Sequence, residues 1–336
     1  MKQAIVVTSI NAPNPVLTSL AIGARKSNYD FIVIGDTKSP ADFHLDGCEF
    51  FDIEKQIATD FAYAKKCPTR HYARKNIGYL IAISRGTKLI VETDDDNFPR
   101  EGFFEPRSRE VTEPCSAGKG WVNVYSYFSP NKIWPRGFPL DRILSPTQEY
   151  DSLPIMQGDC PIQQGLADEN PDVDAIYRLI LPLPQNFRTD RRLMLATGSW
   201  CPFNSQNTTW WADAFALLYL PAYCSFRMTD IWRSFVAQRI AWENDWGTLF
   251  HEPTVWQDRN EHNLHRDFTD EVPGYLNNDR IRETLQGLSL EKGTDKLCSN
   301  LRRCYEALVE LGVIGKEELP LLDAWINDLQ NMSSLS

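Results

Sequence analysis

The sequence predicts an α/β fold with a mostly parallel central sheet, and three observations support this prediction. Residues 4–7 and 31–34 are continuously apolar, as expected of strands that helices cover on both faces. A segment of helical character, residues 15–27, lies between them. A second helical segment, residues 72–86, leads into a third apolar strand at residues 89–91. This alternation of strands and helices is typical of a doubly wound sheet.

The first two predicted strands end in polar residues. Thr8 and Ser9 follow the first strand, and Asp36 follows the second. Because open α/β sheets bind ligands outside the carboxyl ends of their strands, we expect these side chains to contact the nucleoside of a ligand. Ordinary turn chemistry is the alternative explanation.

The later elements are less regular. Residues 99–184 are rich in Pro, Gly and aromatic side chains, so we expect loops and short strands there, the clearest strand being residues 120–125. A helix is predicted over residues 229–242, with Thr229 or Asp230 as its N-cap.

The residue pattern near the end of the sequence predicts a C-terminal helical tail. An apolar stripe from Leu297 to Leu311 indicates a helix that ends at Gly312, and a further short helix follows Pro320. We therefore expect a ligand-binding and catalytic domain of residues 1–275 and a C-terminal helical extension of residues 276–336 packed on it.

Composition limits the function classes. The chain has 336 residues, of which 42% are hydrophobic and 24% charged, as in globular proteins. Its net charge of −10 disfavours nucleic acid as a partner, because nucleic-acid binding depends on Lys and Arg. No segment approaches the roughly 20 apolar residues that cross a bilayer, so we expect no integral membrane segment. The eight cysteines show no CxxC pair, which favours free thiols in a reducing cytoplasm.

The most informative feature is the acidic run that ends the third strand. Residues 92–97 read Glu-Thr-Asp-Asp-Asp-Asn and include the three consecutive carboxylates Asp94, Asp95 and Asp96. Carboxylate oxygens suit Mg²⁺ or Mn²⁺, ions that recruit the phosphates of a bound nucleotide. The run therefore predicts a site for a metal and a diphosphate, and a solvated acidic turn is the alternative.

The helix before this strand begins with Arg74, Lys75 and Asn76. A basic first turn opposes the helix dipole, which favours a role outside the helix itself. We expect Arg74 or Lys75 to neutralise nucleotide phosphate and Asn76 to bond the base or the ribose. A solvated basic turn is the alternative.

Asp230 stands at a predicted helix start with Arg227 and Arg233 on either side. A carboxylate fixed there could act as a general base, and the two arginines would keep it ionised if they approach it. Its alternative role is to cap the helix. Upstream, Gly198 would let the backbone approach a sugar or phosphate closely.

Three of the five histidines, His251, His262 and His265, follow in a polar stretch. His251 is the best candidate to complete the metal shell. A zinc site at His262 and His265 is a weaker alternative, because no third ligand pattern lies nearby.

Several motifs together resemble the STELLO family of glycosyltransferases. They are Tyr72 to Tyr79, Thr93 to Asn97, Asn170 to Leu179, Asp230 to Arg233 and Gln257 to Asn260, which together cover most of residues 1–275.

This resemblance implies a GT-A fold, a Rossmann-like α/β domain that uses a nucleotide sugar and a divalent metal. On this pattern Asp94 and Asp96 match the DxD metal ligands, with Asp95 beside them at the nucleotide. Gly198 would lie in the glycine loop, Asp230 would match the catalytic acid at the helix start of inverting enzymes, and His251 would be the late metal-binding histidine.

The preferred function is transfer of a sugar from a nucleotide sugar to a glycan or other acceptor, with Mn²⁺ or Mg²⁺ as cofactor. A UDP-sugar is the preferred donor. A nucleotide-sugar mutase similar to the reversibly glycosylated polypeptides is one alternative. A noncatalytic carbohydrate-binding protein is another, given ten tryptophans that could stack on sugars. A phosphatase of the haloacid-dehalogenase type is disfavoured, because its DxD motif follows the first strand and here the motif follows a later one.

Overall fold

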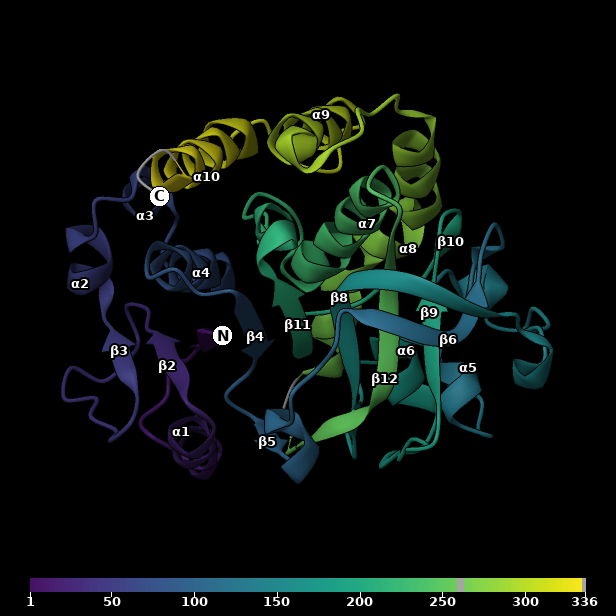
Figure 1. The fold of residues 1–336 in the computed structure, drawn as a ribbon, viewed down its shortest axis with the longest axis horizontal. Helices are drawn as coiled ribbons and strands as arrows, with labels where there is room; N and C mark the ends of the chain where they lie inside the picture. The colour runs from purple at the N-terminus through teal and green to yellow at the C-terminus, as the bar shows by residue number, and fades with distance from the viewer. Residues whose placement is uncertain (259–262, 334–336) are drawn as a thin grey trace.

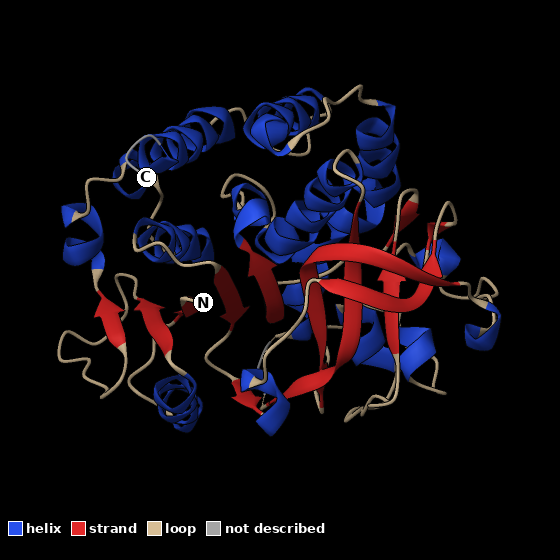
Figure 2. Cartoon of the chain, in the orientation of Figure 1, coloured by secondary structure: helices blue, strands red, loops and turns tan. Residues whose placement is uncertain are grey.

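The computed structural model describes residues 1–258 and 263–333, and a ten-stranded sheet extends across them (Figures 1 and 2). The strand order is β3-β2-β1-β4-β11-β8-β6-β9-β12-β5, and β10 and β7 form a separate pair. The strands are β1 (Gln3–Thr8), β2 (Tyr29–Ile34), β3 (Glu49–Phe51), β4 (Leu89–Thr93), β5 (Asn97–Pro99), β6 (Glu110–Ser116), β7 (Gly120–Trp121), β8 (Ile155–Asp168), β9 (Arg192–Leu195), β10 (Ser199–Trp200), β11 (Asn207–Trp211) and β12 (Trp246–Gln257).

Helices surround this sheet. The α-helices are α1 (Pro15–Ser27), α2 (Ile53–Ala58), α3 (Ala62–Lys66), α4 (Lys75–Ser84), α5 (Tyr125–Phe128), α6 (Ala175–Ile180), α7 (Thr229–Trp242), α8 (Leu264–Gly287), α9 (Leu297–Glu310) and α10 (Glu318–Ser333). The 3-10 helices are η1 (Tyr72–Arg74), η2 (Glu101–Phe104), η3 (Leu140–Arg142), η4 (Tyr150–Ser152), η5 (Ala212–Leu218), η6 (Phe226–Met228) and η7 (Thr294–Lys296).

Strands β3, β2, β1 and β4 form the parallel part of the sheet. Its three long strands and helix α1 confirm the sequence prediction. Figure 1 shows α1 and α4 on opposite faces of these strands, and alternate side chains of β1 belong to the apolar clusters of these two helices. Ile5 and Val7 belong to the apolar cluster of Leu17 in α1, whereas Val6 belongs to that of Ile77 in α4. Burial on both faces explains the continuous apolar runs.

The rest of the sheet is mixed. β11 is antiparallel to β4 and β8, and β8 pairs antiparallel with β6 but parallel with β12. Because β9 pairs with both β6 and β12, strands β8, β6, β9 and β12 close into a barrel-like ring. The α/β fold is therefore confirmed, but the sheet is not mostly parallel. Neighbouring parallel strands need connections of a dozen or more residues, usually helical. Helices α5 and α6 have only four and six residues and are too short to form such connections.

Helix α7 has the predicted bounds and is buried along its whole length, although its N-cap is Met228. The two helices predicted for the tail correspond to α9 and α10. The carboxylate of Asp328 in α10 accepts hydrogen bonds from the backbone N–H groups of Ala62 and Tyr63, at 2.9 and 2.8 Å, and so ties the tail to α3. Helix α8 was not predicted.

Helix α8 also spans the boundary predicted at residue 275, so the division into domains at that point stays a prediction. None of the described helices combines the length and the apolar character that a membrane span needs.

Candidate functional site

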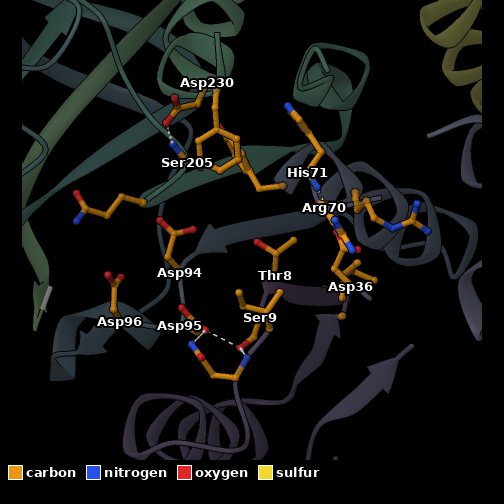
Figure 3. Close-up of a pocket in the computed structure, with 18 of the residues that line it drawn as sticks. Thr8, Ser9, Asp36, Arg70, His71, Asp94, Asp95, Asp96, Ser205 and Asp230 are labelled. Atoms are coloured by element: carbon orange, nitrogen blue, oxygen red, sulfur yellow. Dashed lines mark hydrogen bonds between the residues drawn. The ribbon is translucent and has the colours of Figure 1, made fainter. Parts of the chain in front are cut away.

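A cavity of about 540 Å³ opens at the carboxyl ends of β1, β2 and β4, where this topology favours ligand binding. Its opposite wall comes from residues 204–206, η6 and the start of α7. In Figure 3, Asp94 lies between the Ser9–Asp95 pair and the Asp230–Ser205 pair. The predicted site residues that line the cavity are Thr8, Ser9, Asp36, Arg74, Asp94, Asp95, Asp96, Arg227 and Asp230.

Asp95 is fixed by the residues that follow β1. Its Oδ2 accepts hydrogen bonds from Ser9 Oγ at 2.5 Å and from Asn11 Nδ2 at 2.9 Å. Its backbone carbonyl accepts from Asn14 Nδ2 at 2.8 Å, and Asn14 also caps α1. Asp95 therefore joins the acidic turn to the tips of β1 and α1.

Asp94 is paired with Lys75. The fully buried Lys75 ammonium lies 3.0 Å from Asp94 Oδ1 and also donates to the carbonyls of Thr93 and Ser205, at 2.7 and 3.2 Å. Burial raises the pKa of Asp94, while Lys75 opposes that rise. Lys75 thus fixes the orientation of Asp94. Because the Lys75 ammonium bonds groups inside the protein, Arg74 is the cation of the Arg74–Lys75 pair that lines the cavity.

Asp96 is held by β12. Its Oδ2 accepts a hydrogen bond from Gln257 Nε2 at 3.0 Å, and its carbonyl accepts from the backbone N–H of Asp258 at 3.0 Å. Strand β5 extends this contact, because Asn97 pairs with Gln257. The last residues of β12 therefore support the acidic turn.

Asp94 and Asp96 of the acidic turn both line the cavity. Among the described residues, no group of three or more His, Cys, Asp and Glu side chains is arranged to hold a metal ion. Mg²⁺ is commonly bound by one or two carboxylates together with substrate phosphates and waters. Asp94 and Asp96 would supply the two carboxylates.

Asp230 shares an arginine with Asp172. The guanidinium of Arg136 donates to Asp230 Oδ1 and Oδ2 at 3.1 and 3.0 Å, and to Asp172 Oδ1 and Oδ2 at 2.8 and 2.9 Å. Asp230 also accepts hydrogen bonds from the backbone N–H groups of Ser205 and Ile231. Burial raises the pKa of Asp172, but Arg136 outweighs it and the pKa falls to about 2.

The two arginines that flank Asp230 in the sequence have other partners. Arg227 lines the cavity but donates to Glu271 Oε1 at 3.0 and 2.8 Å. Arg233 lies outside the cavity lining, and its guanidinium pairs with Glu92 at 2.8 Å. Because their guanidinium groups bond these glutamates, Arg136 is the arginine that bonds the Asp230 carboxylate.

Asn76 and Gly198 are not brought to the cavity. Asn76 is buried, and its amide bonds Tyr63 Oη and both backbone polar groups of Leu220. Gly198 has φ +82°, and a Cβ placed on it would lie 3.0 Å from the Cα of Gly118. Its missing side chain therefore permits close approach of two backbone segments, not of a ligand.

His251 is also separate from the acidic turn. It contacts the guanidinium of Arg107, and burial together with Arg107 lowers its pKa well below the usual range. His251 does not line the cavity, and it lies six positions before Gln257, the residue that bonds Asp96. The structure thus does not place His251 with Asp94 and Asp96. His265 is exposed in α8, and His262 lies outside the described residues.

Sequence reasoning missed Arg136 and gave no role to Asp172. Arg136 lies in a Pro-rich and Gly-rich segment without periodicity, 94 positions from Asp230. Asp172 lies in the motif from Asn170 to Leu179, and this was the only sequence feature that could have indicated a role for it. His71 was missed too: its backbone N–H donates to Asp36 Oδ2 at 3.1 Å, and burial lowers its pKa to about 4 despite the opposing effect of Asp36.

Comparison with known proteins agrees with the motifs. Residues 227–335 match a family model described as STELLO glycosyltransferases. Two Arabidopsis thaliana proteins, named Probable glycosyltransferase STELLO2 and Probable glycosyltransferase STELLO1, are 28% and 27% identical over 97% of this chain. The chain spans 44% of the length of each. These matches confirm the resemblance to the STELLO family that the sequence motifs indicated.

Proposed function

We propose that this chain is a glycosyltransferase of GT-A type that moves a sugar from a UDP-sugar to a glycan or other acceptor, with Mn²⁺ or Mg²⁺ as cofactor and with inversion at the sugar. One observation carries the proposal. A single cavity joins the acidic turn after β4, at the carboxyl ends of parallel strands, to the buried carboxylate of Asp230. The order β3-β2-β1-β4 supports the Rossmann-like part of the proposal. We place the catalytic domain at residues 1–275 and the protein in the cytoplasm.

The donor nucleotide would occupy the part of the cavity formed by the parallel strands. Thr8, Asp36 and the segment from Arg70 to Tyr72 line that part, and Arg74 and Lys38 add positive charge for phosphate. Arg74 Nη2 is buried and has no hydrogen-bond partner among the described residues, so it has a donor to offer. A metal bound by Asp94 and Asp96 would stabilise negative charge on the departing diphosphate.

The acceptor would meet Asp230. The acceptor hydroxyl gives its proton to the Asp230 carboxylate while its oxygen bonds the anomeric carbon, and the diphosphate leaves with the electrons of the broken bond. Two features prepare Asp230 for this role. Arg136 donates a hydrogen bond to each of its carboxylate oxygens, and the N–H groups of Ser205 and Ile231 fix its orientation.

Calorimetry with UDP tests the donor half of this proposal. We expect UDP to bind much more tightly in Mn²⁺ than in chelator, and Asp96→Ala to abolish that difference; because Asp96 is half-buried, a melting curve verifies that the variant is folded. Asp42→Ala, which removes an exposed carboxylate outside the cavity, is the matched control. Equal UDP affinity in chelator and in Mn²⁺ would contradict the proposal.

A further inference from the structure

A second cavity, of about 440 Å³, lies away from the proposed donor site. It is formed by β7, the residue Tyr127 of α5, the loop of residues 142–148 and Arg282 of α8. It shares no lining residue with the first cavity. In Figure 1, α5 lies on the side of the molecule away from β2 and β3. A ligand here would not compete with a nucleotide for the same atoms.

The charge of this cavity is opposite to that of the first. Its lining contains Lys119, Arg142 and Arg282 and no carboxylate, in a chain whose net charge is −10. Asp141 lies 3.4 Å from Arg142 and Asp279 lies 3.4 Å from Arg282. Glu283 also lies 3.2 Å from Arg282, so both guanidinium groups are paired with acids outside the lining, whereas Lys119 has no ion pair among the described residues. The cavity therefore favours an anionic ligand.

Its uncharged lining has the character of a sugar site. Three aromatic residues, Trp121, Tyr127 and Phe138, line it. The indole N–H of Trp121 donates to Asp279 Oδ1 at 2.6 Å, which fixes the ring. Tyr127 and Phe138 are at most 4% exposed, so the half-buried Trp121 is the ring that can offer an apolar face to a sugar. Binding sites commonly combine such a face with a few polar groups.

A buried acceptor adds an independent signal. Asn123 lines the cavity, and its Nδ2 donates to the carbonyl of Ile133 at 2.8 Å, which sets the orientation of the amide. Its Oδ1 is buried and has no hydrogen-bond partner among the described residues. Buried polar atoms normally have partners. A ligand hydroxyl would supply one.

We propose that this cavity is a binding site for an anionic oligosaccharide. Lys119 and Arg142 bind a carboxylate of the sugar, Asn123 Oδ1 accepts a hydrogen bond from a hydroxyl, and Trp121 packs against a ring. The proposal goes beyond sugar transfer at the first cavity and does not depend on it, because binding needs neither nucleotide nor metal.

The test is calorimetry of the full chain with three probes: a trimer of galacturonic acid, its methyl-esterified form, which has nearly the same shape and no charge, and inorganic phosphate. We expect the acidic trimer to bind in the absence of nucleotide. The esterified trimer and phosphate should each bind at least about tenfold more weakly, since one lacks the charge and the other lacks the rings.

The double variant Lys119→Ala with Arg142→Ala should weaken binding of the acidic trimer at least about tenfold. Both residues are exposed, so the variant should fold, and a melting curve verifies this. Lys292→Ala with Lys316→Ala, which removes two exposed cations far from the cavity lining, should bind like the unchanged chain. Equal affinity for the acidic and esterified trimers, equal affinity for phosphate, undiminished binding by the double variant, or no binding at millimolar trimer would each overturn the proposal.

Discussion

The parallel strands β1, β2 and β4 and the ring of strands β8, β6, β9 and β12 bury their side chains in different ways. In the parallel part, helices cover both faces and the buried side chains are almost all apolar. In the ring, buried polar residues such as Gln163, Gln164 and Thr248 alternate with apolar ones, and the first three residues of β8 are exposed. A strand that is apolar throughout is readable from sequence, whereas a strand with buried polar residues is not.

The comparison also separates two chemical roles. Asp94, Asp95 and Asp96 follow a strand of the parallel part, whereas Asp230, Arg136 and Asp172 come from segments that follow it in the chain. On the proposed function, the first group binds the donor and the second acts on the acceptor. Variants in the two groups should therefore affect different steps.

The largest effect is expected from Asp230→Asn. An amide cannot accept the proton of the acceptor, so turnover should fall by about 10²–10⁴-fold, while the affinity for UDP should remain unchanged. Initial-rate kinetics with donor hydrolysis as readout, together with calorimetry, measure both quantities. Asp213→Asn, which changes a more exposed aspartate, is the control. Near-normal turnover of Asp230→Asn would leave Asp230 with a structural role only.

The next largest effect concerns the buried ion pair between Glu92 of β4 and Arg233 of α7. Glu92 of β4 accepts hydrogen bonds from Tyr79 Oη, from Trp210 Nε1 at 2.8 Å and from Arg233 of α7, and both side chains of the Glu92–Arg233 pair are at most 1% exposed. Glu92→Gln leaves the guanidinium of Arg233 buried without a countercharge. The free energy of unfolding should fall by about 3–5 kcal/mol.

Urea unfolding measures this loss, and the double variant Glu92→Gln with Arg233→Met should recover part of it, because the unpaired charge is then gone. A loss below about 1 kcal/mol for the single variant would show that this ion pair contributes little to stability.

A third effect should appear as a pH dependence. Glu318 at the start of α10 accepts hydrogen bonds from Tyr219 Oη and from the N–H groups of Ala222 and Tyr223. Burial raises its pKa to about 7, although these donors oppose the rise. The folded state therefore binds a proton that the unfolded state has released, and this contribution to stability is lost as the pH rises from the ordinary glutamate pKa to about 7.

Replacing Glu318 with Gln removes this titration. The difference in the free energy of unfolding between the unchanged chain and Glu318→Gln should change by up to about 3 kcal/mol between pH 4.5 and pH 8. Denaturant unfolding at several pH values checks it. Parallel pH profiles of the two proteins would mean that Glu318 does not titrate in this window.

Local patterns were sufficient for much of the fold and for one wall of the site. The apolar runs located β1, β2 and β4, and helical spacing located α7 with its bounds. The acidic turn was visible because its carboxylates are adjacent in the chain. Arg136 could not be found in this way, because its two carboxylate partners lie 36 and 94 positions away.

The wrong expectations have a similar physical origin. Arg233 was expected to keep Asp230 ionised if it approached that carboxylate, but its guanidinium pairs with Glu92. The strand expected over residues 120–125 is only two residues long, because its partner β10 pairs with it over Gly120 and Trp121 alone. In both cases long-range contacts decided what the local pattern left open.

The smallest effects are expected on the surface, where the two parts should behave alike. The guanidinium of Arg85 donates to both oxygens of Glu49 beside the parallel strands, and that of Arg192 donates to both oxygens of Glu252 on the ring. Because these pairs are partly exposed to water, Glu49→Gln and Glu252→Gln should each lower the free energy of unfolding by no more than about 1 kcal/mol, and 1 M salt should reduce either loss. If Glu252→Gln cost more than about 2 kcal/mol while Glu49→Gln cost little, polar contacts would stabilise the ring at its surface as well as in its interior. The two parts would then differ in the stability that their surface ion pairs provide as well as in their buried polar side chains.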